Sequence, residues 1–212
     1  MASEPWTKEG GPLTSADGTA LSTRGRLTRR ALLEAAEVVF ADVGWEEASI
    51  VKITERAGVS QGTFYRYFVS KQAIFDELVD DLNRRVRHAM AEGSARGQTR
   101  AEIERYGFEA FFRFTAEHPA LYRVIRQAEF ASPRALHRHY EKIAEGYSAA
   151  LRQSMDSGEI EPGDPEVLAY ALMGIGELIG MRWILWNEDA EVPPEVIDAM
   201  MTFIRRGLGA TS

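Results

Sequence analysis

The stretch from Gln61 to Lys71 carries side chains that could read and grip a nucleic acid. Gln61 and Arg66 are long enough to reach base edges in a major groove, where Gln pairs with adenine and Arg with guanine. Gly62 has no side chain and would allow the backbone to approach a duplex closely. Hydroxyl groups and one ammonium group suited to phosphate contacts lie among these residues, at Thr63, Tyr65, Tyr67 and Lys71. The stretch therefore predicts a site for double-stranded DNA.

Residue types that support catalysis are sparse in this chain. It has no cysteine, which excludes disulfides and thiolate chemistry, and it has four histidines. His137 and His139 stand two residues apart and would point to different sides of a helix, which argues against a shared metal ion. The sequence contains no nucleophile motif and no glycine-rich phosphate loop. We therefore expect no enzymatic activity, no metal and no cofactor.

The net charge of −7 is unevenly distributed along the chain. Residues 22–71 hold eight Lys and Arg against six Asp and Glu, whereas residues 72–212 hold sixteen against twenty-three. A locally basic face can bind phosphates while an acidic remainder keeps the protein soluble. No apolar run reaches the roughly 20 residues of a membrane helix, and the first 23 residues lack the basic-then-apolar order of a secretory signal. These features favour a cytoplasmic protein with no membrane partner.

Helical periodicity extends over most of the chain and predicts an all-α fold of about nine helices. Ser49 and Ser60 can cap two short helices, over residues 50–57 and 61–68. Gly58 can take the left-handed conformation that lets the chain turn between them. Two short helices joined in this way form a helix-turn-helix, whose second helix enters the major groove of DNA.

Residues 24–82 resemble the DNA-binding domain of the tetracycline-repressor (TetR) family. The resemblance implies that Gln61, Gly62 and Arg66 read bases. It implies phosphate contacts from a second set of residues, namely Ser49, Thr63, Tyr65, Tyr67 and Lys71. The features that carry the resemblance are Phe40-Ala41-Asp42-Val43-Gly44-Trp45, Ile53, Ala57-Gly58-Val59-Ser60, Gly62-Thr63-Phe64-Tyr65, Tyr67-Phe68 and Ser70-Lys71.

Three regions are expected along the chain. Residues 1–23 are rich in Gly, Ser, Thr, Ala and Pro and predict a disordered tail. Residues 24–84 form the helix-turn-helix domain, and residues 85–212 form a C-terminal domain for effector binding and dimerisation. The C-terminal domain shows no motif as specific as that of the DNA-binding domain.

The C-terminal region is rich in aromatic side chains, nine of which lie between Tyr106 and Tyr147. This density fits the wall of a ligand cavity, and it equally fits a plain aromatic core. Glu177 stands on an otherwise apolar segment, so its charge needs a partner such as Arg182, a tyrosine or a ligand. We expect a small apolar or amphiphilic effector, with a lipid-like molecule favoured. The expected lining is Phe108, Phe111, Phe112, Tyr122, Tyr140, Tyr147, Met173, Glu177 and Trp183.

The helix expected over residues 164–186 is apolar on two faces, and a helix that is apolar all round is buried all round. In a small domain this requires a partner subunit. The resemblance implies a four-helix dimer interface made by this helix and the last one, which starts near Pro194. Gly174, Gly176 and Gly180 would permit close contact between helices there. The apolar residues expected in the last helix are Val196, Ile197, Met200, Met201, Ile204 and Leu208.

Two hypotheses for the function remain open. The favoured one is a homodimeric repressor that binds a palindromic operator and is released by a small effector. The alternative is a DNA-tethered activator or adapter whose C-terminal domain binds a protein partner and no small molecule. An enclosed, partly apolar pocket would support the first hypothesis, and a solid core with an exposed apolar patch would support the second.

Overall fold

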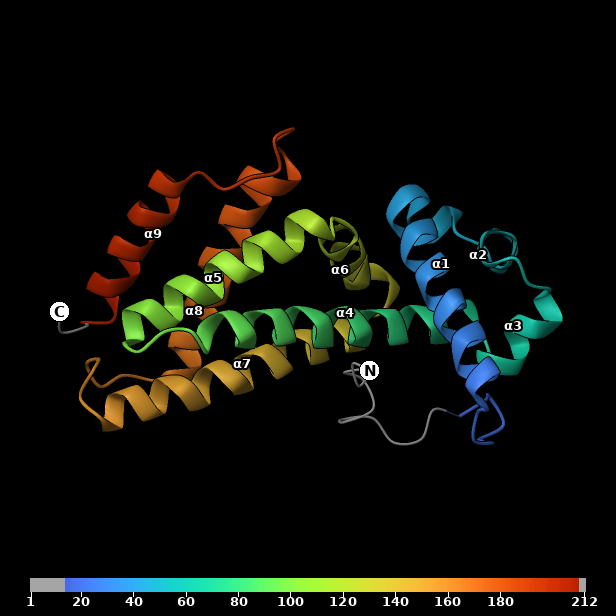
Figure 1. Ribbon diagram of the computed structural model, residues 1–212, viewed down its shortest axis with the longest axis horizontal. Helices are drawn as coiled ribbons and strands as arrows, with labels where there is room; N and C mark the ends of the chain where they lie inside the picture. The colour runs from blue at the N-terminus through green and yellow to red at the C-terminus, as the bar shows by residue number, and fades with distance from the viewer. Residues whose placement is uncertain (1–13, 210–212) are drawn as a thin grey trace.

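The computed structural model describes residues 14–209, which fold into nine α-helices and one π-helical segment (Figure 1). The all-α prediction is thus confirmed. Over this range the only β pairing is an isolated antiparallel bridge between Thr14 and Ala20. The helices are α1 (Thr23–Glu47), α2 (Ile50–Ala57), α3 (Gln61–Tyr67), α4 (Lys71–Ser94), α5 (Arg100–Glu117), α6 (Ala120–Ala131), α7 (Pro133–Asp156), α8 (Pro165–Gly180), η2 (Met181–Leu185) and α9 (Pro194–Gly207).

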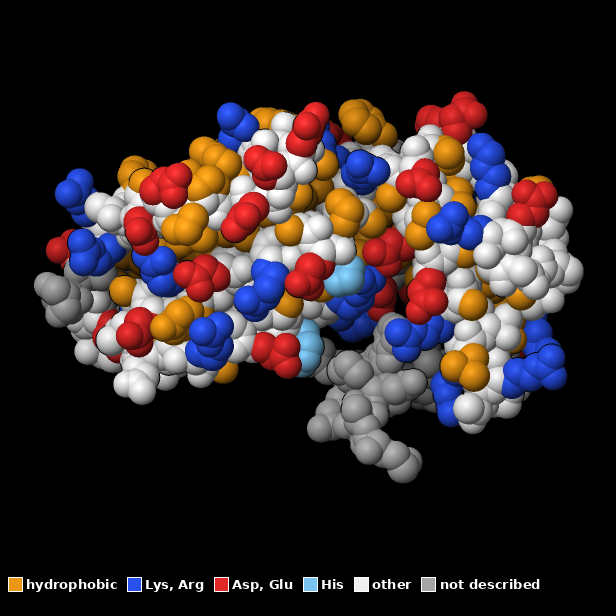
Figure 2. Space-filling view, turned by 45° about the horizontal axis from the view of Figure 1, so that its top comes forward, with side chains coloured by type: hydrophobic (Ala, Val, Ile, Leu, Met, Phe, Trp, Pro, Cys, Tyr) orange, Lys and Arg blue, Asp and Glu red, His pale blue; other side chains and the backbone are white. Residues whose placement is uncertain are grey.

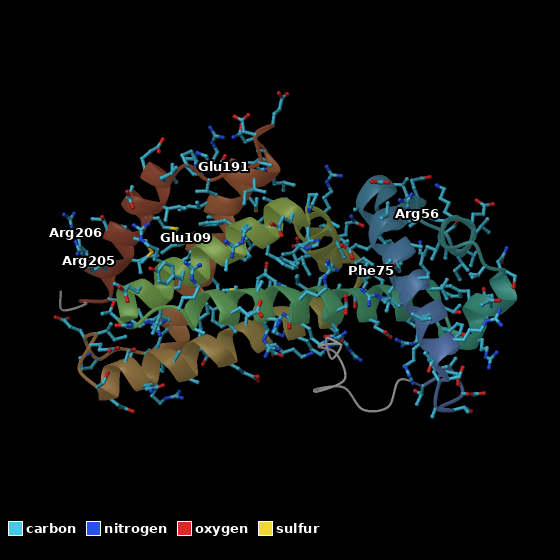
Figure 3. All side chains as sticks on the ribbon, in the orientation of Figure 1. Arg56, Phe75, Glu109, Glu191, Arg205 and Arg206 are labelled. Atoms are coloured by element: carbon cyan, nitrogen blue, oxygen red, sulfur yellow. The ribbon has the colours of Figure 1, made fainter. Side chains whose placement is uncertain are left out.

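Helices α1, α2 and α3 gather at one end of the molecule, against the first turns of α4 (Figure 1). Phe75 lies between α1 and α4 (Figure 3), where its ring contacts Phe40 and Trp45 edge-on with centroids 5.0 Å apart. Such aromatic packing fixes the angle between the two helices. The fully buried side chains of this first core include Leu32, Phe40, Ile53, Phe64, Ile74 and Phe75.

The turn between α2 and α3 forms as the serine and glycine pattern predicts. The Ser49 hydroxyl oxygen accepts a hydrogen bond from the Lys52 amide at 3.2 Å, and the Ser60 oxygen accepts from the Thr63 amide at 3.2 Å. Gly58 lies at φ 67°, in the left-handed region that residues with a side chain rarely adopt. The predicted helix-turn-helix is therefore present.

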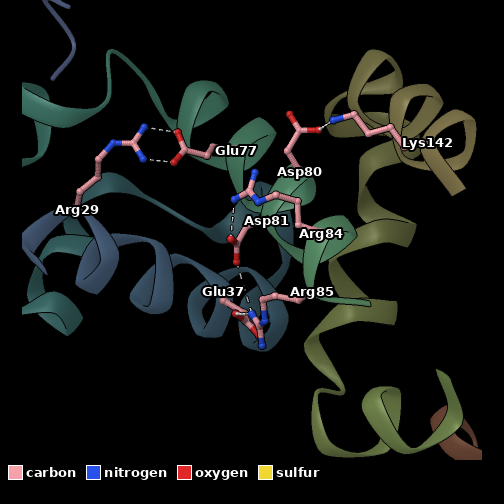
Figure 4. Close-up of polar contacts among 8 residues, drawn as sticks. All are labelled: Arg29, Glu37, Glu77, Asp80, Asp81, Arg84, Arg85 and Lys142. Carbon is pink, nitrogen blue, oxygen red and sulfur yellow. Dashed lines mark hydrogen bonds and ion pairs between the residues drawn. The ribbon is translucent and has the colours of Figure 1, made fainter. Parts of the chain in front are cut away.

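Helix α4 is one uninterrupted helix of 24 residues along the middle of the molecule (Figure 1). The domain boundary expected after residue 84 therefore lies inside a helix. Ion pairs tie this helix to α1 on one side and to α7 on the other (Figure 4). These pairs are Arg29–Glu77, in which both terminal guanidinium nitrogens donate to the carboxylate, Arg85–Glu37 at 2.8 Å and Lys142–Asp80 at 2.9 Å.

Helices α5 to α9 surround a second core. Thr99 and Glu102 form the predicted capping box at the start of α5. Asp164 caps α8 by accepting hydrogen bonds from the Glu166 and Val167 amides. The buried apolar residues of this second core are Phe108, Phe112, Leu151, Ile160, Ala169, Leu172, Ile184, Val192, Met200, Met201, Ile204 and Leu208.

The segment expected as one helix over residues 164–186 changes its hydrogen-bonding pattern near its end. α8 stops at Gly180, and Met181–Leu185 form a π-helical turn. A side chain at Gly180 would collide with the Tyr122 hydroxyl, and one at Gly176 would collide with the Phe108 ring. Both glycines pack inside the subunit, so their expected place in the dimer interface is wrong. Gly174 has open space beside it.

The segment Pro165–Leu185 is long and apolar enough to cross a membrane by length and composition alone. Glu166, Glu177 and Arg182 interrupt its apolar sequence. It packs against α5 and α7, and 39% of its most apolar window is buried. Its burial therefore resembles that of a core helix with one side left uncovered.

Residues 14–22 form an ordered turn before α1, so the expected disordered tail does not describe them. Gly18, at φ 85°, lets the chain reverse direction. The Asp17 carboxylate then accepts hydrogen bonds from the Ser15 hydroxyl at 2.5 Å and the Thr19 amide at 3.0 Å. The expectation for residues 1–13 lies outside the described residues.

Candidate functional site

The short helix α3 divides its side chains between solvent and core. Gln61, Gly62, Tyr65 and Arg66 are exposed, and Tyr65 keeps 51% of its surface accessible. Phe64 faces the core together with Phe68, which follows the helix. The exposed face has the composition of a DNA-reading surface, with an amide, a guanidinium and a phenol beside a residue that has no side chain.

Tyr67 lies on the buried face of α3, with 7% of its surface exposed. It stands three residues after Phe64, and residues at this spacing share one face of a helix. The structure therefore does not bring Tyr67 together with the exposed residues of α3.

The hydroxyls at the two helix starts already serve as caps. Thr63 places its hydroxyl 3.0 Å from that of Ser60, and Ser49 caps α2. Each capped N-terminus still presents free amides and the positive end of a helix dipole, which suits a phosphate group.

Lys71 was expected to contact a phosphate, but its ammonium group points toward the end of α1. Its ammonium group donates to the carbonyl oxygens of Trp45 at 2.8 Å and Ala48 at 2.9 Å. The same group lies 4.3 Å from the centre of the Trp45 ring. Lys71 thus closes the end of α1, where Gly44 leaves the helical conformation at φ 78°. An ammonium group has three donors, so one remains for a phosphate.

Exposed basic residues surround the helix-turn-helix beyond those that the sequence reading named. Arg24 and Arg26 are exposed at the start of α1, and Lys52 and Arg56 are exposed on α2. In Figure 2, basic and acidic side chains alternate over the visible face. The sequence indicated these residues only through the excess of Lys and Arg over Asp and Glu in residues 22–71. That excess does not show which side chains face solvent.

The aromatic residues of the C-terminal region form a packed cluster between α5 and α6. Phe111 is the centre of it, with ring centroids 5.6 Å from Phe112 and 6.2 Å from Tyr122. Phe108 stacks on Phe112 at 6.1 Å. A molecule entering this cluster must displace at least one ring.

Glu177 points from α8 to a tyrosine of α7. The Tyr140 hydroxyl donates to its two carboxylate oxygens, at 3.0 Å from each. The Tyr122 hydroxyl lies 3.5 Å from the backbone carbonyl of Glu177. Burial, reinforced by the Glu177 charge, raises the pKa of Tyr122 and of Tyr140, so both hydroxyls remain protonated donors. The sequence reading predicted this need of Glu177 for a partner, and a tyrosine supplies it.

Tyr147 belongs to a different polar group from the one around Glu177. Its hydroxyl donates to Glu104 at 3.2 Å, and Glu104 also pairs with Arg100. Burial raises the pKa of Tyr147 to about 12. The sequence analysis did not identify this buried ion pair. The spacing of four residues between Arg100 and Glu104, which places them on one face of a helix, was the available signal.

The remaining two residues of the expected lining lie on α8 and η2. Met173 is half-buried and stands one helical turn before Glu177. Trp183 is half-buried against the second core, and the Arg182 guanidinium lies 5.3 Å from its ring. Arg182 is thus engaged with Trp183, and it is not the partner of Glu177.

The junction between α4 and α7 contains a buried polar pair. Asn83 is fully buried and donates its side-chain amide to Nδ1 of His139 at 3.1 Å and to the His139 carbonyl at 2.9 Å. Burial, opposed by the Asp80 charge, lowers the pKa of His139 to about 4. His139 is therefore neutral at physiological pH, with its proton on Nε2.

Large apolar side chains are exposed on the last two α-helices. On α8 they recur along one stripe, with Val167 at 64% and Leu178 at 63% exposure, and on α9 Phe203 is 68% exposed. The α9 residues expected at an interface, such as Met200 and Ile204, are buried inside the subunit instead. They face the second core because α9 packs on α5 with that side.

Comparison with known proteins identifies the helix-turn-helix end. The family model for bacterial regulatory proteins of the tetR family matches residues 32–78, from the first helix into α4. An uncharacterized HTH-type transcriptional regulator of Bacillus subtilis, YdgC, is 27% identical over 190 residues, which cover 85% of this chain and 94% of YdgC. The chain belongs to the TetR family. TetR-family proteins are transcription regulators, so this chain is a regulator and not an enzyme.

Solved structures place most of the chain in the TetR fold. A TetR-family regulator from Marinobacter aquaeolei shares 24% identity at a TM-score of 0.73, over 89% of this chain and 98% of its own. The fatty acid degradation regulator FadR from Bacillus halodurans shares 17% identity at a TM-score of 0.75, over 87% of this chain and 97% of its own. The nine-helix TetR architecture therefore extends through α9.

The matched family span includes every residue expected to contact DNA, from Ser49 to Lys71. It excludes α5 to α9, where the aromatic cluster and Glu177 lie. Membership of the TetR family thus implies an operator-binding end, whereas the residues expected to line an effector site lie outside the match. Across the described residues, no group of three or more His, Asp or Glu side chains could hold a metal ion.

Proposed function

We propose that this TetR-family regulator is a homodimeric repressor that releases a palindromic operator when a small amphiphilic effector binds among α5 to α8. The observation that carries the proposal is a series of side-chain contacts that connects α8 to α4 through α7. Tyr140 contacts Glu177 beside the aromatic cluster, and its neighbour His139 contacts Asn83 of α4. α4 in turn begins at the helix-turn-helix. Because the regulator acts on chromosomal DNA, we place it in the cytoplasm.

The DNA-binding part of the proposal uses the exposed face of α3. Gln61 and Arg66 contact base edges, and Gly62 allows α3 to approach the duplex. Phosphate contacts come from the hydroxyls and the ammonium group around α3, at Ser49, Thr63, Tyr65, Tyr67 and Lys71. Tyr67 would need its hydroxyl to reach the rim of the domain, since its ring is buried.

The exposed apolar side chains of α8 and α9 support a homodimer through these helices. Val167, Leu178 and Phe203 would each lose most of their accessible surface in a four-helix interface. Burial of one such side chain contributes about 1.5–3 kcal/mol. Two-fold symmetry then requires a palindromic operator, with the two α3 helices roughly 34–36 Å apart.

The proposed effector site combines the aromatic cluster with the Tyr140–Glu177 pair. Phe108, Phe111 and Phe112 offer apolar surface, whereas Tyr122 and Glu177 offer polar groups that orient a ligand. A lipid-like molecule fits this combination, and the structural neighbour FadR is described as a fatty acid degradation regulator. The rest of the proposed lining is Tyr140, Tyr147, Met173 and Trp183.

An effector can change DNA binding only if it prefers one conformation of the dimer over the other. Entry between Phe111 and Tyr122 would move α6 or the π-helical turn, because Tyr122 presses on Gly180. That movement reaches α7 through the Tyr140–Glu177 pair. The proposed effect is a spacing of the two α3 helices that no longer matches the operator.

The adapter hypothesis also has observations in its favour. The aromatic cluster is packed ring against ring, as in a plain core. Phe130, at the end of α6, is 85% exposed and could meet a protein partner. In this hypothesis the effector site is a structural core, and regulation depends on recruitment.

A selection of genomic fragments bound by the purified protein, followed by ligand screening on the protein–DNA complex, tests both hypotheses. The repressor proposal predicts one palindromic site and at least one amphiphile that releases it. A site that no amphiphile releases, together with increased transcription when the protein is bound, would favour the adapter.

A further inference from the structure

The ordered turn before α1, residues 14–22, has a fixed internal structure; we call it the N-terminal turn. The Ser15 amide donates to the Thr19 carbonyl and the Gly18 amide to the Ser15 carbonyl, both at 2.9 Å. Asp17 accepts from Ser15 and Thr19, and these hydrogen bonds lower the pKa of Asp17 to about 2. Its carboxylate is thus charged at every physiological pH and holds the turn closed.

The N-terminal turn is attached to the start of α1. The Arg26 guanidinium donates to the Leu21 carbonyl at 3.1 Å, and the Ser22 hydroxyl oxygen accepts from the Gly25 amide at 3.2 Å. Leu21 also packs against the first core. One end of the turn is therefore anchored to the longest helix of the DNA-binding end.

The tip of the N-terminal turn is bonded to the recognition helix. The Ala16 amide donates to the Arg66 carbonyl at 2.9 Å. Carbonyls in the last turn of a helix have no partner within the helix, and Arg66 stands in the last turn of α3. In Figure 1 the segment before α1 lies beside the end of α3. A stretch of chain that precedes the domain thus caps the helix that carries Arg66.

This bond adds a restraint to the end of a short helix. α3 has only seven residues, and a helix of that length is unstable without tertiary support. Its first turn is held by the Ser60 cap. Its last turn packs Phe64 and Tyr67 into the core, but Arg66 between them faces solvent. The bond to Ala16 therefore adds a restraint at Arg66 itself. Restraining the Arg66 backbone reduces the ordering that base recognition requires.

We propose that the N-terminal turn is a positioning element for the recognition helix, which holds the last turn of α3 in place and so sharpens base reading by Arg66. The proposal rests on the proposed role of Arg66 in operator recognition. Asp17 acts by closing the turn; as an anion it is repelled by phosphates and does not itself bind DNA.

Two variants with matched controls test the proposal on the full-length protein. Ala16→Pro removes the amide that bonds Arg66, whereas Ala16→Ser keeps it. Asp17→Ala removes the acceptor that closes the turn, whereas Asp17→Asn keeps an acceptor oxygen at the same place. We expect both controls to keep the turn, so they report the effects of substitution alone.

The first readout is hydrogen exchange of the Phe68 amide in the absence of DNA, because this amide bonds Phe64 across the last turn of α3. We expect exchange about fivefold faster in Ala16→Pro and Asp17→Ala, as for the loss of one hydrogen bond, and unchanged exchange in the controls. Phe40 in α1 is the internal reference. Unchanged exchange at Phe68 in both test variants overturns the proposal, whether or not the protein reads an operator.

The second readout is discrimination between the operator and a site altered at the base pair that Arg66 contacts. We expect Ala16→Pro to reduce this discrimination about tenfold without changing the salt dependence. In the double variant with Arg66→Ala, Ala16→Pro should reduce discrimination no further than Arg66→Ala alone does. Equal weakening on both DNA sites would overturn the positioning role. If Arg66→Ala alone leaves discrimination intact while Ala16→Pro reduces it, the proposed role of Arg66 fails, and the turn positions α3 for another reader.

Discussion

His139 and Tyr140 are consecutive residues of α7 whose side chains bond to different neighbouring helices. His139 accepts from Asn83 of α4 at 3.1 Å, and Tyr140 donates to Glu177 of α8 at 3.0 Å. Their rings meet edge to face with centroids 5.2 Å apart. In the proposed mechanism, these two neighbouring residues carry a change at Glu177 to α4.

Tyr140→Phe should alter the response to the effector without altering operator binding by the free protein. The ring stays in place, but Glu177 loses its hydroxyl donor, so the effector concentration for half-release should shift by about tenfold. Operator affinity without effector should stay within about twofold of wild type. Titration of the protein–DNA complex measures both quantities.

A suitable control for this variant is Tyr106→Phe, since Tyr106 lies on α5 with the Arg96 guanidinium 4.5 Å from its ring, away from Glu177. If Tyr140→Phe and Tyr106→Phe respond to the effector as wild type does, the effector site is elsewhere.

Arg66→Ala should relax sequence preference at one base pair in each half-site. A good bidentate contact between a side chain and a base contributes about 1–3 kcal/mol of discrimination, and Arg66 is exposed on α3. Binding to a set of single-base operator variants checks the prediction. An unchanged preference at every position would show that Arg66 is not a base reader.

Lys71→Ala should weaken binding to all DNA sequences alike and reduce the slope of log affinity against log salt by about one, since one phosphate contact is lost. It should also lower the melting temperature, because the ammonium group bonds the carbonyls of Trp45 and Ala48. Salt titrations and thermal unfolding separate the two roles. A lower melting temperature with an unchanged salt slope would leave Lys71 with a structural role alone.

Leu178→Glu and Phe203→Glu should each yield monomers that no longer hold a palindromic site, because both side chains are more than 60% exposed on α8 and α9. Phe130→Glu, at a similarly exposed apolar residue of α6, should remain dimeric. Sedimentation at micromolar concentration is the measurement. Charge at Ile204 is not a useful test, since this residue is 3% exposed and its substitution would unfold the second core. A wild-type monomer in the same experiment would contradict the dimer.

Stability should fall as the pH is lowered from about 6.5 to about 4, in part because of His139. The folded protein keeps this side chain neutral to about pH 4, whereas the unfolded chain protonates it near its ordinary value of 6.5. The unfolded state binds more protons in this window, so the free energy of unfolding decreases with falling pH, by an amount on the order of 3 kcal/mol. Urea unfolding at several pH values should show that His139→Gln loses this contribution and that the exposed His137→Gln retains it. Parallel pH profiles for both variants and wild type would contradict the assignment.

The DNA-binding end was predictable because its signals are local. Ser49, Gly58 and Ser60 act through caps and a left-handed turn within a few residues, so their sequence spacing determines the geometry. The surroundings of Lys71 and Tyr67 were not predictable in the same way, and their phosphate contacts stay a prediction. Their environment depends on Trp45 and on the packing of α3, which act across tens of residues of sequence.

The C-terminal end was predictable only in outline. The need of Glu177 for a partner follows from one charge on an apolar helix, but the choice of Tyr140 over Arg182 depends on how α7 and α8 meet. Gly176 and Gly180 illustrate the same limit. Small residues permit close contact, but nothing in their spacing distinguishes a partner subunit from Phe108 and Tyr122 of the same chain.

Because α4 is one unbroken helix, a small tilt at one of its ends becomes a larger displacement at the other. Its 24 residues span about 36 Å, so a tilt of about 5° at the effector end displaces the other end by about 3 Å. In a two-fold dimer the two displacements are opposite, and the separation of the α3 helices changes by about 6 Å against the 34–36 Å that two successive major grooves require. In the proposed dimer, a tilt of α4 by a few degrees would therefore be enough to take one recognition helix out of its groove.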